Sequence, residues 1–163
     1  MVIMQNIFDP ATLEIICRLA VALLLGMLIG VERVWAHKTA GIRTYALVSM
    51  GSALFVIISE MMAQAYGLGS SFDPSRIASQ VVVGVGFIGA GLIFTKESKL
   101  VGITTATGLW VSAGIGMAAG FRLYNIAIIA TVLTLFVLVV LWFVEAGFKK
   151  TDLYQKQNLD DNQ

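Results

Sequence analysis

The chain has 163 residues, of which 58% are hydrophobic, and its formal net charge is +1. A mean hydropathy of +0.85 excludes an ordinary soluble domain of this size, and the balanced charge excludes a basic surface that binds nucleic acid. The single cysteine and single histidine exclude an intrachain disulfide and a histidine-rich zinc site. Apolar runs of about 20 residues recur along the chain, which predicts an all-α, polytopic membrane protein embedded in the lipid bilayer.

Five transmembrane helices in a compact bundle are predicted, at residues 11–32, 43–66, 74–95, 103–120 and 122–145. The N-terminal stretch MVIMQNIFDP has no basic region, so a cleaved signal peptide is not expected. Residues 1–145 are expected to form one transmembrane domain. Residues 146–163 are expected to form a short, polar, disordered tail.

Basic residues are distributed unevenly between the connecting segments. Most lysines and arginines outside the helices lie in the segments 33–43 and 96–102 and in the tail, whereas the opposite connections hold Arg76 and Arg122. The positive-inside rule therefore predicts an external N-terminus and a cytoplasmic C-terminus.

Charged and polar residues lie at the predicted outer ends of the first three helices. Arg18 lies about seven residues into the first helix, where a charge is costly. Glu60 ends the second helix, and Asp73, Arg76 and Gln80 begin the third. One interpretation is that Glu60 and Asp73 attract a divalent cation such as Mg²⁺. The other is that these groups form ion pairs that fix the helix ends, with Arg76 contacting Glu60 or Asp73.

A second polar group, at the predicted cytoplasmic side, surrounds the first connection. It contains Glu32, Arg33, His37, Lys38 and Arg43. Two interpretations are open: the group binds lipid phosphates or an acidic patch of a partner, or it enforces the topology.

Two stretches of the sequence align with one another. KTAGIRTYA (38–46) matches KLVGITTAT (99–107), which predicts that helix hairpins 1-2 and 3-4 form a parallel repeat. Each Gly-Ile-x-Thr would open a returning helix, with Thr44 or Thr105 as its cap. Chance similarity between apolar segments is the alternative.

Small residues recur at helical spacing, which in lipid favours close helix packing. The helix at 74–95 has small residues on two faces and is therefore predicted to lie at the centre of the bundle, whereas the helix at 122–145 is expected to face lipid. The alternative is that the glycines line an ion path or break the helix. The predicted packing positions are Gly26, Gly30, Gly84, Gly86, Gly89, Gly91, Gly108, Ser112, Gly116 and Gly120.

The sequence contains no Gly-rich phosphate loop, no Ser/His/Asp set and no metalloprotease motif. We therefore expect no enzyme activity and no cofactor, with Mg²⁺ as the one ion to consider.

Four motifs resemble those of the MgtC/SapB family of bacterial inner-membrane proteins. They are LIGVER (28–33), AGIRTYALVSMGSALF (40–55), DPSRIASQVVVGVGFIGAGLIF (73–94) and VGITTATGLWVSAGIGMAAG (101–120), and the resemblance covers about residues 11–145. It implies roles for the residues that match the motifs. These residues are Glu32, Arg33, Gly41, Arg43, Thr44, Asp73, Arg76, Gln80, Gly84, Gly86, Gly89, Gly91, Thr104, Thr105 and Trp110.

The resemblance also implies a function. The family is associated with growth at low magnesium, with virulence through survival inside macrophages, and with inhibition of the F-type ATP synthase. Many members carry an ACT-like C-terminal domain, and this chain is expected to be a short form without it. Two functions are open. One is a non-enzymatic regulator that binds copies of itself or another membrane protein. The other is a Mg²⁺ transporter or channel.

Overall fold

The computed structural model describes residues 9–66, 73–96 and 98–149. In this part of the chain it is an all-α protein with five helices and one small β-hairpin, which confirms the expected fold class. The elements in chain order are α2 (Pro10–Trp35), α3 (Ile42–Ala65), α4 (Pro74–Ala90), β1 (Phe94–Lys96), β2 (Lys99–Val101), α5 (Ile103–Gly120) and α6 (Tyr124–Lys149). Helix α6 continues past the expected boundary at residue 145. The expected disorder of the tail concerns residues 150–163, which lie outside the described residues.

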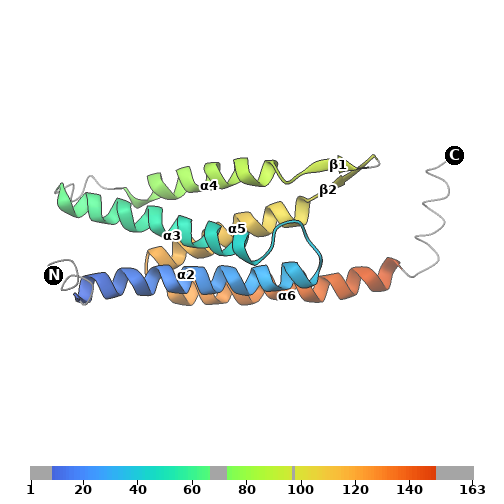
Figure 1. Ribbon diagram of the computed structural model, residues 1–163, viewed down its shortest axis with the longest axis horizontal. Coiled ribbons are helices and arrows are strands. Elements are labelled where there is room, and N and C mark those ends of the chain that lie inside the picture. Colours follow the sequence, from blue (N-terminus) through green and yellow to red (C-terminus); the bar gives the residue numbers. More distant parts are fainter. Residues whose placement is uncertain (1–8, 67–72, 97, 150–163) are drawn as a thin grey trace.

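The helices run alternately in opposite directions along one long axis (Figure 1). Helices α2 and α4 begin, and α3 and α5 finish, at one end of the bundle, which we call the Glu60 end. The opposite end, where α2 and α4 finish and α3 and α5 begin, is the Arg33 end. The β-hairpin and the α2–α3 connection both lie at the Arg33 end (Figure 1).

Three helices, α2, α3 and α6, are long and apolar enough to cross a membrane. Helices α4 and α5 have 17 and 18 residues. At 1.5 Å per residue they reach about 26 Å, slightly less than a hydrocarbon core of about 30 Å. The structure therefore supports a membrane protein with three candidate spans, and five crossings stay a prediction.

The third predicted helix ends earlier than expected. Helix α4 finishes at Ala90, and Phe94–Lys96 then pairs antiparallel with Lys99–Val101, so Phe94 lies opposite Val101. Gly102 closes the hairpin with a φ of +95°, in the left-handed region, and a Cβ there would overlap the carbonyl oxygen of Leu92. Only glycine fits this position easily.

The centre of the bundle is α5, not α4, so the prediction of a central 74–95 helix is wrong. Helix α5 contacts each of the other four helices, whereas α4 packs on α5 and α3. The reason lies in the faces that meet. A Cβ on Gly116 would overlap the backbone of Ser49, whereas a Cβ on Gly84 or Gly86 would have no atom within 4 Å. Gly84 and Gly86 are therefore exposed, whereas Gly89, nearer the end of α4, is buried.

The other small residues divide in the same way. Added Cβ atoms at Gly26, Gly30, Gly108 and Gly120 would come within 3 Å of α3. Gly89 makes an ordinary contact with Ala106 at 3.5 Å, and Gly91 faces only the carbonyls of its own helix end. Ser112 is fully buried, and its hydroxyl donates to the Tyr45 carbonyl oxygen at 3.1 Å. The close packing is therefore made by α2 and α5 on α3.

The proposed repeat is matched only at two helix starts. Gly41 and Gly102 are the N-cap residues of α3 and α5. Thr44 and Thr105 therefore lie inside the first turns, and the expectation that they cap the helices is wrong. A β-hairpin connects α4 to α5, whereas a short turn connects α2 to α3. The repeat as a whole stays a prediction.

Candidate functional site

The candidate site is a network of charged side chains at the Glu60 end, built around Arg18. Positions at three- or four-residue spacing, including Arg18, Ala22, Gly26, Ile29 and Arg33, form the buried face of α2. This periodicity places Arg18 inside the bundle, where it is 3% exposed. A guanidinium cannot lose its proton to become neutral, so it needs partners there.

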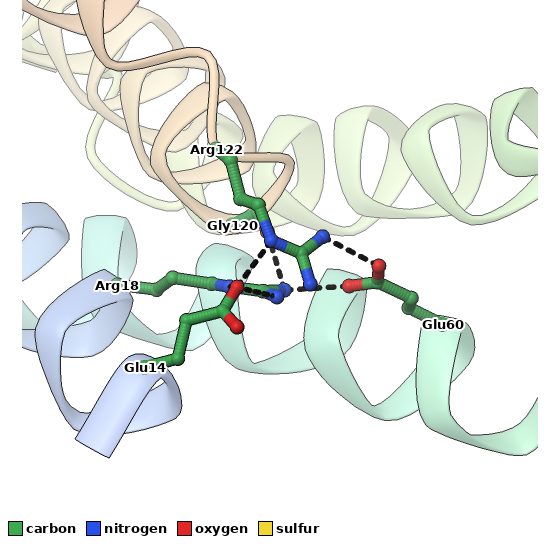
Figure 2. A network of polar contacts seen from close by, with 5 residues as sticks. All are labelled: Glu14, Arg18, Glu60, Gly120 and Arg122. Atoms are coloured by element: carbon green, nitrogen blue, oxygen red, sulfur yellow. Dashed lines mark hydrogen bonds and ion pairs between the residues drawn. The ribbon is translucent and has the colours of Figure 1, made fainter. Parts of the chain in front are cut away.

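Two glutamates and one backbone carbonyl surround Arg18 (Figure 2). Glu14, one turn earlier on α2, accepts from Arg18 Nη2 at 2.5 Å and from Nε at 3.2 Å. Glu60, at the end of α3, accepts from Nη1 at 2.5 Å. The carbonyl oxygen of Gly120, at the end of α5, accepts from the same nitrogen at 3.2 Å. Arg18 thus joins α2, α3 and α5.

Arg122, in the turn between α5 and α6, closes the network. Its Nη1 donates to Glu60 Oε1 at 2.5 Å, and its Nε donates to Glu14 Oε1. The backbone of Arg122 has a φ of +64°, and its N–H donates to the Ala119 carbonyl oxygen, as at a helix C-terminus. Two arginines and two glutamates therefore meet with balanced charge (Figure 2).

The sequence places Glu14 one turn before Arg18 at the predicted outer end, and the structure confirms this pair, but sequence reasoning did not place Arg122 in a site. The i,i+4 spacing from Glu14 to Arg18 was a sufficient signal for that pair. For Arg122 no local signal exists, because its partners lie on α2 and α3, far away in the sequence.

The predicted cation site at Glu60 and Asp73 is not formed as expected. Each oxygen of Glu60 accepts from a different arginine, so its charge is already compensated. Asp73 is exposed immediately before α4 and takes part in an interaction of its own. The described residues contain no group of three or more His, Cys, Asp or Glu that could hold a metal ion.

The predicted contact of Arg76 with Glu60 is wrong, whereas the contact seen with Asp73, the alternative, is a backbone hydrogen bond, from the Arg76 N–H to the Asp73 carbonyl oxygen at 3.2 Å. Arg76 and Gln80 are exposed on α4. Within the described residues the ion pairs of Glu60 are with Arg18 and Arg122, not with Arg76. The Glu60 carboxylate therefore pairs with Arg18 and Arg122 of the network, and not with Arg76 on α4.

A second buried arginine lies at the Arg33 end. Arg33 is 2% exposed, and its Nε donates to Glu32 on the same helix. Tyr45 of α3 is fully buried, and Arg33 and Glu32 are its charged neighbours. Its hydroxyl donates to the Thr105 carbonyl oxygen at 3.1 Å. The sequence did not single out Tyr45. Its bond fixes the start of α3 against the start of α5.

The remaining predicted polar residues are spread over both ends and are not brought together. Thr105 is buried and Thr44 is partly buried. The exposed members are Arg43, Arg76, Gln80, Thr104 and Trp110.

A groove of about 570 Å³ lies between α3 and α4. Its walls are mainly apolar, and Gly51 of α3 and Gly84 of α4 contribute to them. A Cβ on either glycine would have no atom within 4 Å. This groove is the place in the bundle where glycines of two neighbouring helices are left uncovered.

Comparison with known proteins identifies relatives over most of the chain. A family model described as the MgtC family matches residues 19–146. The "Putative magnesium transporter YhiD" of Escherichia coli K12 is 49% identical over 129 residues, which are 78% of this chain and 60% of the relative. "Protein MgtC" of Salmonella typhimurium LT2 is 45% identical over 120 residues, which are 74% of this chain and 49% of the relative. An uncharacterized protein of Haemophilus influenzae is 39% identical, over 82% of this chain and 58% of the relative.

The chain thus spans about half to three fifths of the length of these relatives. No solved structure matches this one at a significant level.

Proposed function

This chain belongs to the MgtC family, and on that premise we propose that it is a non-enzymatic regulator of the bacterial inner membrane. It acts by binding a transmembrane helix of another membrane protein in the groove between α3 and α4. The family resemblance suggests adaptation to low magnesium as the process, intracellular survival as its consequence in pathogens, and a membrane complex such as the F-type ATP synthase as the target.

One observation carries this proposal: Gly51 and Gly84 line the same groove with nothing packed on them. Glycine in a helix interior costs about 0.5–1 kcal/mol relative to alanine. In lipid that cost is offset where small residues let another helix approach closely. Gly116 has such a contact inside this chain, and Gly84 has none. A partner helix in the groove would provide it.

The charge network supports the same proposal. The ion pairs of Glu14 and Glu60 with Arg18 and Arg122 connect α2, α3 and the α5–α6 turn and so hold them together. A bundle held together in this way keeps the α3 side of the groove in a fixed position, which lowers the entropic cost of binding a partner helix.

Purification from native membranes in mild detergent tests the proposal. We expect the wild-type protein to retain a membrane protein other than itself and Gly84→Leu to lose it, because leucine fills the groove. Gly86→Leu is the matched control, since Gly86 is open on the same helix but does not line the groove. Equal recovery with all three proteins, or recovery of the chain alone, contradicts the proposal.

Magnesium transport is the second candidate function, and the name of the Escherichia coli relative favours it. Purified protein in liposomes decides between the two. Magnesium uptake above that of empty liposomes, abolished by Glu60→Gln, supports transport. Uptake equal to that of empty liposomes excludes it.

A further inference from the structure

The Arg33 end contains a buried positive charge that the protein does not fully satisfy. Arg33 Nη1 is buried and has no hydrogen-bond partner within the described part of the chain. Buried polar groups are normally paired, and a guanidinium is costly to leave unpaired. Arg18, on the same face of α2, has two carboxylates and a carbonyl oxygen. Among the residues that the structure describes, the one ion pair of Arg33 is with Glu32.

The pair with Glu32 is a limited one. It uses Arg33 Nε and a carboxylate from the adjacent residue. Adjacent residues on a helix do not face each other, so this carboxylate cannot also cover the far side of the guanidinium. The Glu32 side chain is 15% exposed and that of Arg33 is 3% exposed, so Glu32 is the more accessible member of the pair.

The surroundings of Arg33 increase the positive potential. Gly30 lies directly against Ile42, the first residue of α3, so the backbone of Arg33, about 4.5 Å further along α2, lies just beyond the start of α3. Tyr45 ties the start of α3 to that of α5. Both helices begin at a glycine N-cap, which has no side chain to bond the N–H groups of the first turn. These helix starts carry partial positive charge.

Exposed cations surround the same end. Lys38 and Arg43 flank the α2–α3 connection, and Lys96 and Lys99 lie on the β-hairpin. Among the described residues of these segments, Glu32 is the only acid; the sequence has Glu97 as well, outside the described residues. Exposed cations at this end are also what the positive-inside rule requires. That rule does not explain a buried arginine without a full set of partners.

We propose that Arg33 is the centre of a phosphate-binding site that opens at the Arg33 end. A phosphate group offers several strong acceptor oxygens and suits the planar guanidinium in bidentate geometry. It approaches past Glu32, whose side chain moves aside, and it takes Nη1 as its first donor. The phosphate belongs either to an anionic lipid headgroup or to a soluble phosphate compound. The site does not depend on the groove between α3 and α4.

Thermal unfolding of the full chain tests the proposal with two probes. The first probe is inorganic phosphate added to protein in a neutral detergent, at constant ionic strength with chloride. The second is bilayer nanodiscs of phosphatidylglycerol, compared with nanodiscs of phosphatidylcholine. We expect at least one probe to raise the unfolding midpoint. A response to phosphate alone identifies a soluble ligand, and a response to phosphatidylglycerol alone identifies a lipid.

Variants then assign the effect to Arg33. Arg33→Gln is expected to weaken the response at least tenfold in apparent affinity. Lys38→Gln, which removes an exposed charge at the same end, is expected to change it less than threefold. Glu32→Gln removes the competing carboxylate and is expected to strengthen binding several-fold, which keeps the test decisive if Arg33→Gln does not fold. The proposal is overturned if neither probe raises the midpoint, if Glu32→Gln abolishes the response, or if Lys38→Gln weakens it as much as Arg33→Gln.

Discussion

Arg18 on α2 donates to Glu60 on α3 at 2.5 Å, and the arginine of this pair is almost completely buried. The pair connects two helices at the Glu60 end, and Arg122 binds the other oxygen of the same carboxylate. Breaking a buried pair by removing one partner costs about 3–5 kcal/mol, because the remaining charge is left without compensation. We therefore expect Glu60→Gln and Arg18→Ala to lower the free energy of unfolding by about this amount, measured by thermal unfolding in detergent.

Arg76→Ala is the control for this prediction. Arg76 is exposed on α4 and forms no ion pair with Glu60 in the described part of the chain. An exposed substitution of this kind changes stability by less than about 0.5 kcal/mol. A loss with Arg76→Ala equal to that with Glu60→Gln would show that the network is assigned to the wrong arginine.

The packing of α5 predicts that alanine substitutions at two glycines, two residues apart on this helix, differ sharply in their effect on stability. Gly116 lies against the backbone of Ser49, whereas Gly114 is open. Gly116→Ala forces α3 and α5 apart, so we expect little folded, monodisperse protein after purification. Gly114→Ala adds a methyl group in open space and gains helix propensity, so its yield and midpoint should equal or exceed those of the wild type. Normal yield of Gly116→Ala would contradict the observed α3–α5 packing.

Tyr45→Phe isolates one buried hydrogen bond. The change removes the hydroxyl that donates to the Thr105 carbonyl oxygen while the aromatic ring stays in place. Loss of such a bond costs about 0.5–1.5 kcal/mol. Tyr66→Phe, at an exposed position, is the matched control. Equal midpoints for Tyr45→Phe and Tyr66→Phe would show that the hydroxyl does not stabilise the α3–α5 contact.

The membrane orientation is a prediction from the charge distribution. A reporter that is active only outside the cytoplasmic membrane is expected to be silent when fused after Gln163. The same reporter inserted between α3 and α4 is expected to be active. Activity at the C-terminus would require another orientation or another number of crossings.

The five helices could be predicted because each is a long apolar run, and such runs depend on local sequence only. The β-hairpin could not, because its strands are three residues long and its register depends on the close approach of Gly102 to Leu92. The central position of α5 was missed for a similar reason. The positions of small residues in the sequence show which helix faces allow close packing. They do not show which of these faces another helix contacts.

The charge network shows the same limit. Arg18 could be recognised as a costly residue from its place in an apolar run, and Glu14 as its neighbour from the helical spacing. Glu60 was expected to hold a cation, but two arginines from distant parts of the chain neutralise it. Those contacts depend on how α3 ends beside the α5–α6 turn, which no local pattern specifies.

Site-specific photo-crosslinking in living cells tests the central claim, that the α3–α4 groove binds another membrane protein. A photoreactive phenylalanine analogue replaces Phe55, which lines the groove, or Phe136, which lies on α6 and is exposed to a similar extent, 58% against 56%. We predict a crosslinked product with a different membrane protein from position 55 and none from position 136, with the product lost in Gly84→Leu. Equal products from both positions, or crosslinks from position 55 to lipid alone, would contradict the account.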